Sequence, residues 1–371
     1  MSSPSPAPSL PEEGVASMRG THWTDIPAEV LAVLRRGAVL PAHPLALDEK
    51  RQLDRTSQRA LSRYYIDAGA GGLAVGVHAT QFQIRDVGLY RPVLELAAET
   101  AGAWTKRPLI MIAGVIGKTA QAVEEARTAR ALGYHAVLLG LGAMRGANED
   151  ELIAHCAAVA REMPTIGFYL QTAVGGIPLS RAFWSRFAAI DNVIAIKVAP
   201  FNRYRTLDVA FGVVAAGAEE RVTLYTGNDD HIVADLVTPL TIRTAGREAT
   251  LRFKGGLLGH WSVWVRSAVA LLEKIHGCVG CGAIPEDVLA LDSMVTDCNA
   301  VLFDVDNDFA GCIPGCHEVL RRQGLMRTTL CLDPREVLSP DQSAAIDRLY
   351  ATYPELHDDA FVAANLERWR A

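Results

Sequence analysis

The chain repeats one pattern from residue 37 onward, in which a short apolar run rich in β-branched residues precedes an amphipathic helical stretch. The runs lack the alternation of a half-exposed strand, which indicates strands buried on both faces, as in a parallel sheet. Strands that alternate with helices form βαβ units. The runs are GAVLPAH (37–43), GLAVGV (72–77), LIMIAGV (109–115), AVLLGL (136–141), TIGFYL (165–170), VIAIKVA (193–199), VTLYTG (222–227) and GLLGHW (256–261).

Eight such units predict an α/β fold, a single (β/α)₈ TIM barrel over residues 29–276. A doubly wound open sheet is the competing architecture. The open sheet is disfavoured because no GxGxxG motif follows the first run. We expect the protein to need no cofactor.

The two ends of the chain depart from the repeat. Residues 1–28 open with MSSPSPAPSLPEEG, a composition that predicts a disordered or extended tail. The tail lacks the apolar core of a signal peptide, so we expect a cytoplasmic protein with reduced cysteines. Residues 263–276 are expected to form the last barrel helix. Residues 277–371 are expected to form a C-terminal helical region, which packs on the barrel or carries subunit contacts.

Charge and hydropathy argue against two classes of partner. The formal net charge of -6 disfavours a basic nucleic-acid-binding face. No uncharged apolar run reaches the roughly 18 residues that a membrane span requires. We therefore expect a small-molecule substrate, with neither nucleic acid nor membrane as a partner.

The cysteines raise the question of a metal site. Cys278 and Cys281 form a CxxC motif and Cys312 and Cys316 a CxxxC motif, and four such thiolates could bind zinc. The alternative is a set of free, partly buried thiols in a region of helices and loops. We favour the free thiols and predict no metal.

Lys197 is the candidate nucleophile, because it lies near the end of the otherwise apolar run VIAIKVAP. Catalytic side chains of a barrel come from the C-terminal ends of its strands. Burial lowers the pKa of an amine and leaves more of it neutral, as a Schiff-base nucleophile requires. Tyr169 ends the preceding run, where its phenol could relay protons beside an imine. The alternatives are a lysine that reaches water or a salt bridge, and a core tyrosine with a satisfied hydroxyl.

This arrangement resembles the dihydrodipicolinate synthase / N-acetylneuraminate lyase family of class I, Schiff-base aldolases. Tyr169 resembles the tyrosine of the family's YNxP segment, and Lys197 the lysine of its IKD segment, at the interval expected there. Further segments match loosely but in the same order along most of the chain. DAGAGGLAVGVHAT resembles the approach to GTTGE, LYTGNDD the SGDD turn, GLLGHWSV the GADGVISV strand, and IPGCHEVLRRQGLM the NPAPVKAALELLGL helix.

The resemblance implies an imine between Lys197 and a 2-keto acid such as pyruvate, in a homo-oligomer, either a dimer or a tetramer. GTTGE, which holds the substrate carboxylate in the family, is replaced here, so His78, Ala79 and Thr80 are the expected carboxylate-binding residues. His78 is equally compatible with a core or interface position. Gly227 and Trp261 complete the expected substrate-binding set.

Departures from the family pattern bear on the second substrate. The relay tyrosine of the synthase's PYYN segment is absent from residues 141–145, and the arginine that grips a carboxylate falls on Val174. These losses argue against lysine biosynthesis. An aromatic or otherwise apolar second substrate would suit Trp261, Met144 and Val174 better than a dicarboxylic one.

We therefore expect a Schiff-base-forming aldolase, lyase or hydratase-aldolase in which Lys197 forms the imine and Tyr169 moves the proton. A catalytically diverged ligand-binding or regulatory barrel is the alternative, favoured by the missing relay tyrosine and the altered carboxylate loop. A third candidate is a metal-dependent enzyme that uses Asp229, Asp230 and His231, although these residues also suit the start of a helix.

Overall fold

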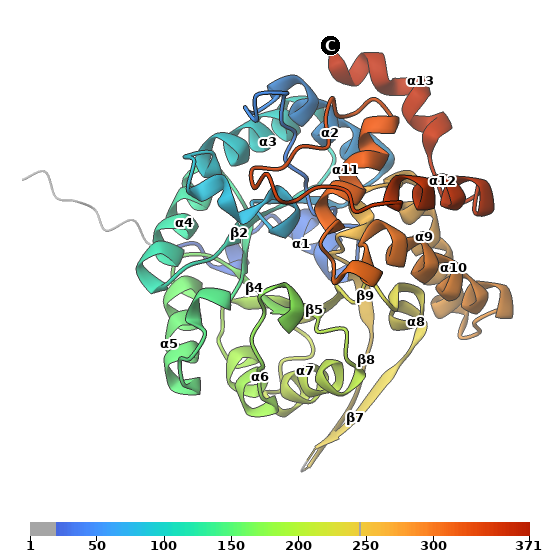
Figure 1. The fold of residues 1–371 in the computed structure, drawn as a ribbon. Helices are drawn as coiled ribbons and strands as arrows, with labels where there is room; N and C mark the ends of the chain where they lie inside the picture. The colour runs from blue at the N-terminus through green and yellow to red at the C-terminus, as the bar shows by residue number, and fades with distance from the viewer. Residues whose placement is uncertain (1–19, 245) are drawn as a thin grey trace, which may run out of the picture.

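A curled parallel sheet surrounded by helices gives the chain a TIM-barrel-like α/β fold (Figure 1). The computed structural model describes residues 20–244 and 246–371. Within them the sheet has seven strands in the order β1-β2-β3-β4-β5-β6-β9, each parallel to the next. The strands are β1 Gly72–Val75, β2 Ile110–Val115, β3 Ala136–Leu139, β4 Thr165–Leu170, β5 Val193–Ala199, β6 Thr223–Thr226 and β9 Phe253–Gly256.

The extended segment at residues 38–42 lies between the two edge strands of this sheet. Val39 forms a parallel bridge with Gly256 of β9, and Ala42 forms one with Ala74 of β1. The segment therefore joins the two edges, at the place predicted for the first strand. A strand edge that is paired in this way leaves no open ladder of backbone donors and acceptors.

Helices follow the strands and cover the outer face of the sheet. The side chain of Asp54 caps α2 by accepting from the N–H groups of Thr56 and Ser57, and α2 ends at Gly69, whose φ of 103° favours glycine. No helix among the described residues is long and apolar enough to cross a membrane. The helices of this layer are α2 Arg55–Ala68, α3 Tyr90–Trp104, α4 Thr119–Ala131, α5 Glu149–Ala160, α6 Arg181–Ala188, α7 Arg203–Ala215, α8 Ile232–Val237 and α9 Val265–Cys281.

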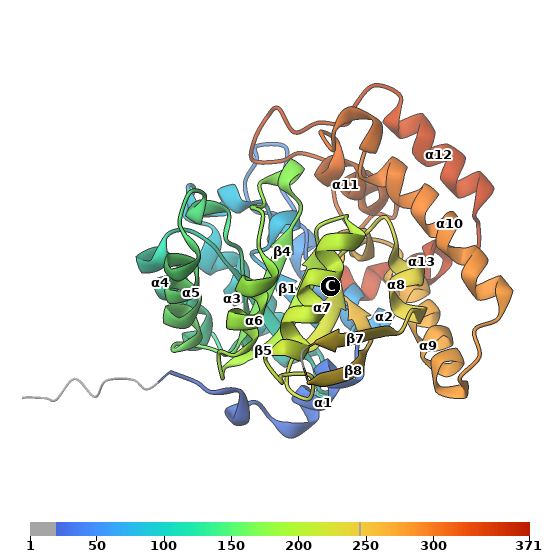
Figure 2. The same cartoon turned by 90° about the horizontal axis from the view of Figure 1, so that it is seen from below.

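The apolar core forms two layers, one inside the curled sheet and one between the sheet and the helices. The inner layer is filled by alternate side chains of the strands, such as Ile112, Leu138 and Ile166. Helix α1 (Ala28–Arg36) adds Val30 and Leu34 to this layer and closes the N-terminal end of the strands (Figure 2). A ligand would therefore reach the inside of the sheet from the opposite end, where the C-termini of the strands lie.

The C-terminal region consists of α10 (Glu286–Leu302), α11 (Cys312–Arg322), α12 (Gln342–Thr352) and α13 (Asp359–Arg370). Its apolar residues belong to the same core cluster as the outer barrel layer. Trp369 of α13, for example, is fully buried, with its ring 5.4 Å from that of Tyr64 in α2. Helix α11 lies over the end of the barrel opposite α1 (Figure 2).

Two elements near the end of the barrel differ from the sequence prediction. The last strand, β9, ends at Gly256 where the predicted run begins, and residues His260–Ser262 form the 3₁₀ helix η6 instead. An antiparallel hairpin of β7 (Leu240–Thr244) and β8 (Arg247–Leu251), which was not predicted, projects from the barrel before β9 (Figure 1). Since GLLGHW is buried and apolar, its composition alone does not separate a strand from a tight helical turn.

The first described residues pack against the barrel. The backbone N–H of Trp23 donates to Oδ1 of Asn192 (2.8 Å), whose Nδ2 donates to the carbonyl of Thr21 (3.0 Å). Thr21 and Trp23 therefore have fixed contacts, within the part of the chain that was predicted as a disordered or extended tail (1–28). Residues 1–19 of that expected tail lie outside the described residues.

Candidate active site

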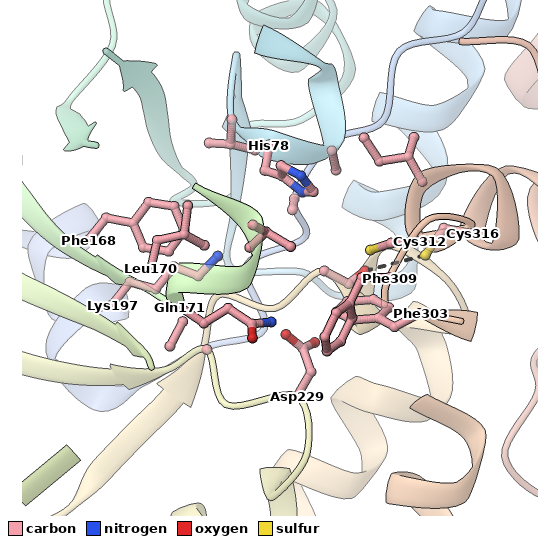
Figure 3. A pocket seen from close by; sticks show the side chains of 18 of the residues that line it. His78, Phe168, Leu170, Gln171, Lys197, Asp229, Phe303, Phe309, Cys312 and Cys316 are labelled. Carbon is pink, nitrogen blue, oxygen red and sulfur yellow. Dashed lines mark hydrogen bonds between the residues drawn. The ribbon is translucent and has the colours of Figure 1, made fainter. Parts of the chain in front are cut away.

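A cavity lies at the C-terminal ends of the strands, beneath α11. Figure 3 shows the amine of Lys197, the imidazole of His78 and the carboxylate of Asp229 directed into this space. Two further strand-end residues, Phe168 and Leu170 of β4, form part of the wall. The rest of the wall comes from the β1 loop and from the C-terminal region, including Val77, Ala79, Phe303, Phe309, Cys312 and Cys316.

Lys197 is buried inside the barrel, with 7% of the residue exposed. Its Nζ lies 4.3 Å from the centroid of the Phe168 ring, a cation–π contact rather than an ion pair. Burial lowers the pKa of Lys197 to about 8, and the charge of Asp229 opposes this shift only in part. A substantial fraction of the amine is therefore neutral near pH 7 to 8, which imine formation requires.

The pairing between β4 and β5 shifts by one residue near the start of both strands. Thr165 pairs with Val193, but Ile166 pairs with Ala195, so Ile194 is an extra residue in β5. Ile194 and Ala195 both point into the barrel. Such a β-bulge changes which side chains of two neighbouring strands lie side by side from that point onward.

After the bulge, the neighbour of Lys197 on β4 is Phe168, and the neighbour of Val198 is Tyr169. Successive side chains of a strand point to opposite faces of the sheet. Phe168 and Lys197 therefore point inward, whereas Tyr169 and Val198 belong to the layer between the sheet and the helices. The sequence interval that suggested a tyrosine–lysine pair takes no account of the extra residue.

Tyr169 consequently lies away from the cavity. Its hydroxyl donates to the carbonyl of Leu179 and accepts from the N–H of Leu179, both at 3.3 Å, and its ring lies 5.2 Å from that of Trp184. The structure does not bring Tyr169 and Lys197 together, and the residue corresponds to the alternative of a core tyrosine with a satisfied hydroxyl. No proton relay through Tyr169 follows from this geometry.

We expect Tyr169→Phe to leave any turnover within about twofold of that of the unchanged protein, because the phenol does not face the cavity. The change should cost about 1 kcal/mol of unfolding free energy, since two backbone groups of Leu179 lose their partner. Chemical denaturation and steady-state kinetics measure the two quantities separately. A loss of turnover by a factor of 100 with unchanged stability would instead place the phenol in the reaction.

The residues expected to bind substrate divide into two groups. His78, Ala79 and Gly227 line the cavity with Lys197. The hydroxyl of Thr80 donates to the carbonyl of His43 (2.7 Å) and accepts from the N–H groups of Gly76 and Val77, so it holds the loop rather than a ligand. Trp261 is buried in the outer core and does not contribute to the cavity lining.

His78 is held at the start of the 3₁₀ helix η2 (His78–Thr80), with its ring 5.8 Å from that of Phe82. Burial, together with the smaller effect of the charge of Lys197, lowers the pKa of His78 to about 4. The imidazole is therefore neutral at physiological pH and presents one donor and one acceptor nitrogen.

Asp229 lies in the same cavity, in the turn that follows β6. It is buried, and its Oδ1 accepts a hydrogen bond from the backbone N–H of His260 (2.9 Å). Burial raises the pKa of Asp229 to about 7, although the His260 hydrogen bond and the charge of Lys197 oppose the shift. From the sequence, Asp229 was predicted only as a possible metal ligand. Its position beside the cavity was indicated by the resemblance of LYTGNDD to the SGDD turn of the family.

The C-terminal wall of the cavity was not foreseen. Phe303 follows α10, while Cys312 and Cys316 lie one helical turn apart on α11 and face the cavity together. Burial raises the pKa of Cys316 to about 12 and raises the pKa of Cys312 well above its usual range, so both are neutral thiols. His317 of α11 also lines the cavity, and burial lowers its pKa to about 4, so the α11 side chains that line the cavity are uncharged.

The metal hypotheses find no support in the described part of the chain. No group of three or more His, Cys, Asp or Glu side chains within residues 20–244 and 246–371 is arranged to hold a metal ion. Cys278 and Cys281 lie in the last turn of α9, whereas Cys312 and Cys316 lie in α11. Nδ1 of His231 lies 3.3 Å from Oδ2 of Asp292, so the imidazole contacts this carboxylate rather than that of Asp229.

Comparisons with known proteins identify relatives with the same fold. The model of the dihydrodipicolinate synthetase family matches residues 36–238. N-acetylneuraminate lyase 2 of Escherichia coli O6:H1 is 22% identical over 324 residues, covering 86% of this chain and 95% of that protein. A 4-hydroxy-tetrahydrodipicolinate synthase of Desulforudis audaxviator is 27% identical over 175 residues, covering 45% and 56%. The crystal structure of dihydrodipicolinate synthase from Aquifex aeolicus has a TM-score of 0.71 at 17% identity, covering 87% of this chain and 99% of that one.

Proposed function

This chain belongs to the dihydrodipicolinate synthetase family, and we propose that it is a lyase or aldolase that forms a Schiff base between Lys197 and a 2-keto acid such as pyruvate. The observation that carries the proposal is the buried, inward-facing amine of Lys197 at the C-terminal end of β5. Attack of the neutral amine on the ketone, followed by loss of water, gives an iminium ion. Its positive nitrogen accepts the electron pair of a neighbouring carbon–carbon or carbon–hydrogen bond as that bond breaks.

The carboxylate of the keto acid is proposed to bind at His78 and Ala79. Both residues line the cavity at the beginning of η2, where the first N–H groups of a helix have no acceptor within that helix. The neutral imidazole of His78 supplies one further donor. Thr80 supports this arrangement from behind, through its hydrogen bonds to the loop backbone.

We propose that the second reactant or the leaving fragment is apolar or aromatic, and that the enzyme is not a dihydrodipicolinate synthase. A groove of about 530 Å³ adjoins the cavity and shares the wall residues Phe168, Leu170 and Val174 with it. The groove's arginine, Arg85, pairs with Glu125 at 2.9 Å and also donates to backbone carbonyls, so its charge is already satisfied. A second carboxylate would find no free cation there among the described residues.

A ligand-binding or regulatory protein that retains the lysine without turnover is the second candidate. The observation that favours it is the orientation of Tyr169, which leaves Phe168 beside Lys197. Such a protein would form the imine but would neither cleave nor build a carbon–carbon bond. Turnover of a 4-hydroxy-2-keto acid by a protein that also forms the adduct would exclude this candidate.

Borohydride reduction in the presence of pyruvate or related 2-keto acids tests the proposal. We expect one covalent adduct per chain, which mass spectrometry of peptides places on Lys197. Because burial lowers the pKa of Lys197 to about 8, the rate of adduct formation should rise about tenfold per pH unit below pH 8 and level off above it. A surface lysine would continue to gain reactivity up to about pH 10.

Two results would contradict the proposal. One is the absence of an adduct with every keto acid of the panel, and the other is labelling that is spread over exposed lysines. The exposed Lys254 on β9 is the internal comparison, since it lies on a barrel strand but outside the cavity.

A further inference from the structure

The enamine chemistry at Lys197 needs a group that takes a proton and returns it, and the cavity lacks the expected phenol. Asp229 is the acidic side chain that faces the cavity in Figure 3. Its Oδ1 is fixed by the N–H of His260 at 2.9 Å, and no hydrogen bond to Oδ2 occurs within the described residues. One oxygen is therefore positioned by the backbone while the other is open to a ligand.

The surroundings of Asp229 favour a carboxyl group that gains and loses its proton near neutral pH. Burial raises the pKa of Asp229, and the neighbouring charge of Asp230 raises it further, while Lys197 and the His260 hydrogen bond lower it. From α11 the cavity is lined by Cys312, Cys316 and His317, and burial keeps all three neutral, because it raises the pKa of both thiols and lowers the pKa of His317 to about 4. Two ionisable groups in one cavity whose pKa values are drawn toward neutrality are typical of an acid–base pair.

We propose that Asp229 is the proton-transfer residue for the reaction at Lys197, an inference that rests on the proposed function. In the step concerned, the C3–H bond of the pyruvate iminium breaks and the proton goes to Oδ2 of Asp229. The C–H electron pair forms the C2=C3 bond, and the C=N pair moves to nitrogen. A cation and a carboxylate thereby become a neutral enamine and a carboxylic acid, and attack of the enamine on an aldehyde returns the proton to the new alkoxide.

The charge on Lys197 adjusts the acidity of Asp229 during this cycle. The iminium ion is positive and favours the ionised carboxylate, which is the form that accepts a proton. The enamine is neutral, so the buried carboxyl then keeps its proton until an alkoxide appears. His78 is less suited to this role because burial lowers its pKa to about 4, which makes its imidazole a weak base toward the C3 proton.

Deuterium exchange into the methyl group of pyruvate measures this proton transfer without a second substrate. The full-length enzyme is incubated with pyruvate in D₂O, and the loss of the methyl proton signal is followed by NMR. Asp229→Asn keeps an oxygen that can accept from the N–H of His260 and removes the titratable group. Asp230→Asn is the matched control, because Asp230 is adjacent, exposed and outside the cavity.

We expect Asp229→Asn to retain borohydride-trapped adduct on Lys197 and to lose exchange by a factor of about 10²–10⁴. Asp230→Asn should exchange within about threefold of the unchanged enzyme. Exchange at the normal rate and with the normal pH dependence in Asp229→Asn overturns the assignment and leaves the Schiff base intact. An unchanged enzyme that forms no adduct at all overturns the proposed function, and the role of Asp229 with it.

Asp229→Glu and the pH profile cover the case in which the amide variant does not fold. The longer carboxylate should restore measurable exchange, because the titratable group is present although displaced. In the unchanged enzyme, exchange at saturating pyruvate should fall as the pH drops and the carboxylate is protonated. A rate that is independent of pH from 5 to 8 would contradict proton transfer to a carboxylate.

Discussion

Lys197→Ala is expected to abolish the keto-acid adduct and to reduce carbon–carbon bond cleavage by roughly 10³–10⁶-fold, as removal of a covalent nucleophile does. The fold should survive, because the change removes a buried amine that forms no ion pair with any described residue. Mass spectrometry after borohydride reduction measures the adduct, and far-UV circular dichroism checks the fold.

Lys254→Ala provides the control for this experiment. Lys254 also lies in a barrel strand, but its side chain is exposed and is not part of the cavity. The variant should label on Lys197 at the normal rate. Persistent labelling in the Lys197 variant, together with its loss in the Lys254 variant, would move the nucleophile to a different strand and defeat the assignment.

Gly227→Ala is expected to slow adduct formation by about 10–100-fold, because the new methyl group occupies space that the Lys197 side chain fills. A Cβ atom at Gly227 would lie 2.7 Å from Cε of Lys197 and 2.8 Å from Cβ of Ala199. Both distances are shorter than a carbon–carbon contact allows, and overpacking of this kind costs about 1–3 kcal/mol. The rate of borohydride-trapped labelling at fixed pyruvate and pH is the measurement.

Gly102→Ala is the matched control, since a Cβ atom there meets nothing within 4 Å and the residue lies within α3. That variant should label normally and be slightly more stable, because alanine favours a helix over glycine by up to about 1 kcal/mol. Unchanged labelling of Gly227→Ala would show that Lys197 reacts from another rotamer, away from this turn.

The order of the barrel elements could be predicted from the sequence because a buried parallel strand and an amphipathic helix have different hydrophobic periods. Lys197 could be predicted for the same reason, since a charged residue within an apolar strand is conspicuous. The orientation of Tyr169 could not. In strands that are apolar on both faces, no polar residue marks which side points inward, and the bulge at Ile194 leaves no signature in composition.

The C-terminal contribution to the cavity was also beyond prediction from the sequence. Phe303 and Cys312 are more than a hundred residues from Lys197 in the sequence. Only packing decides that α11 lies over the strand ends rather than elsewhere on the barrel. For Trp261 the error was one of register, since the predicted last strand is in fact the turn after β9.

The wall that α11 provides has a consequence for how this protein can change over generations. The groups assigned to bond making come from the strand ends of the barrel, whereas Cys312, Cys316 and Phe309 shape the space above them. Mutations in the last fifth of the gene can therefore alter which molecules enter, while the codons for Lys197 and Asp229 remain untouched. Substrate preference can therefore change by mutation in α11 while the residues of the proposed imine chemistry are retained.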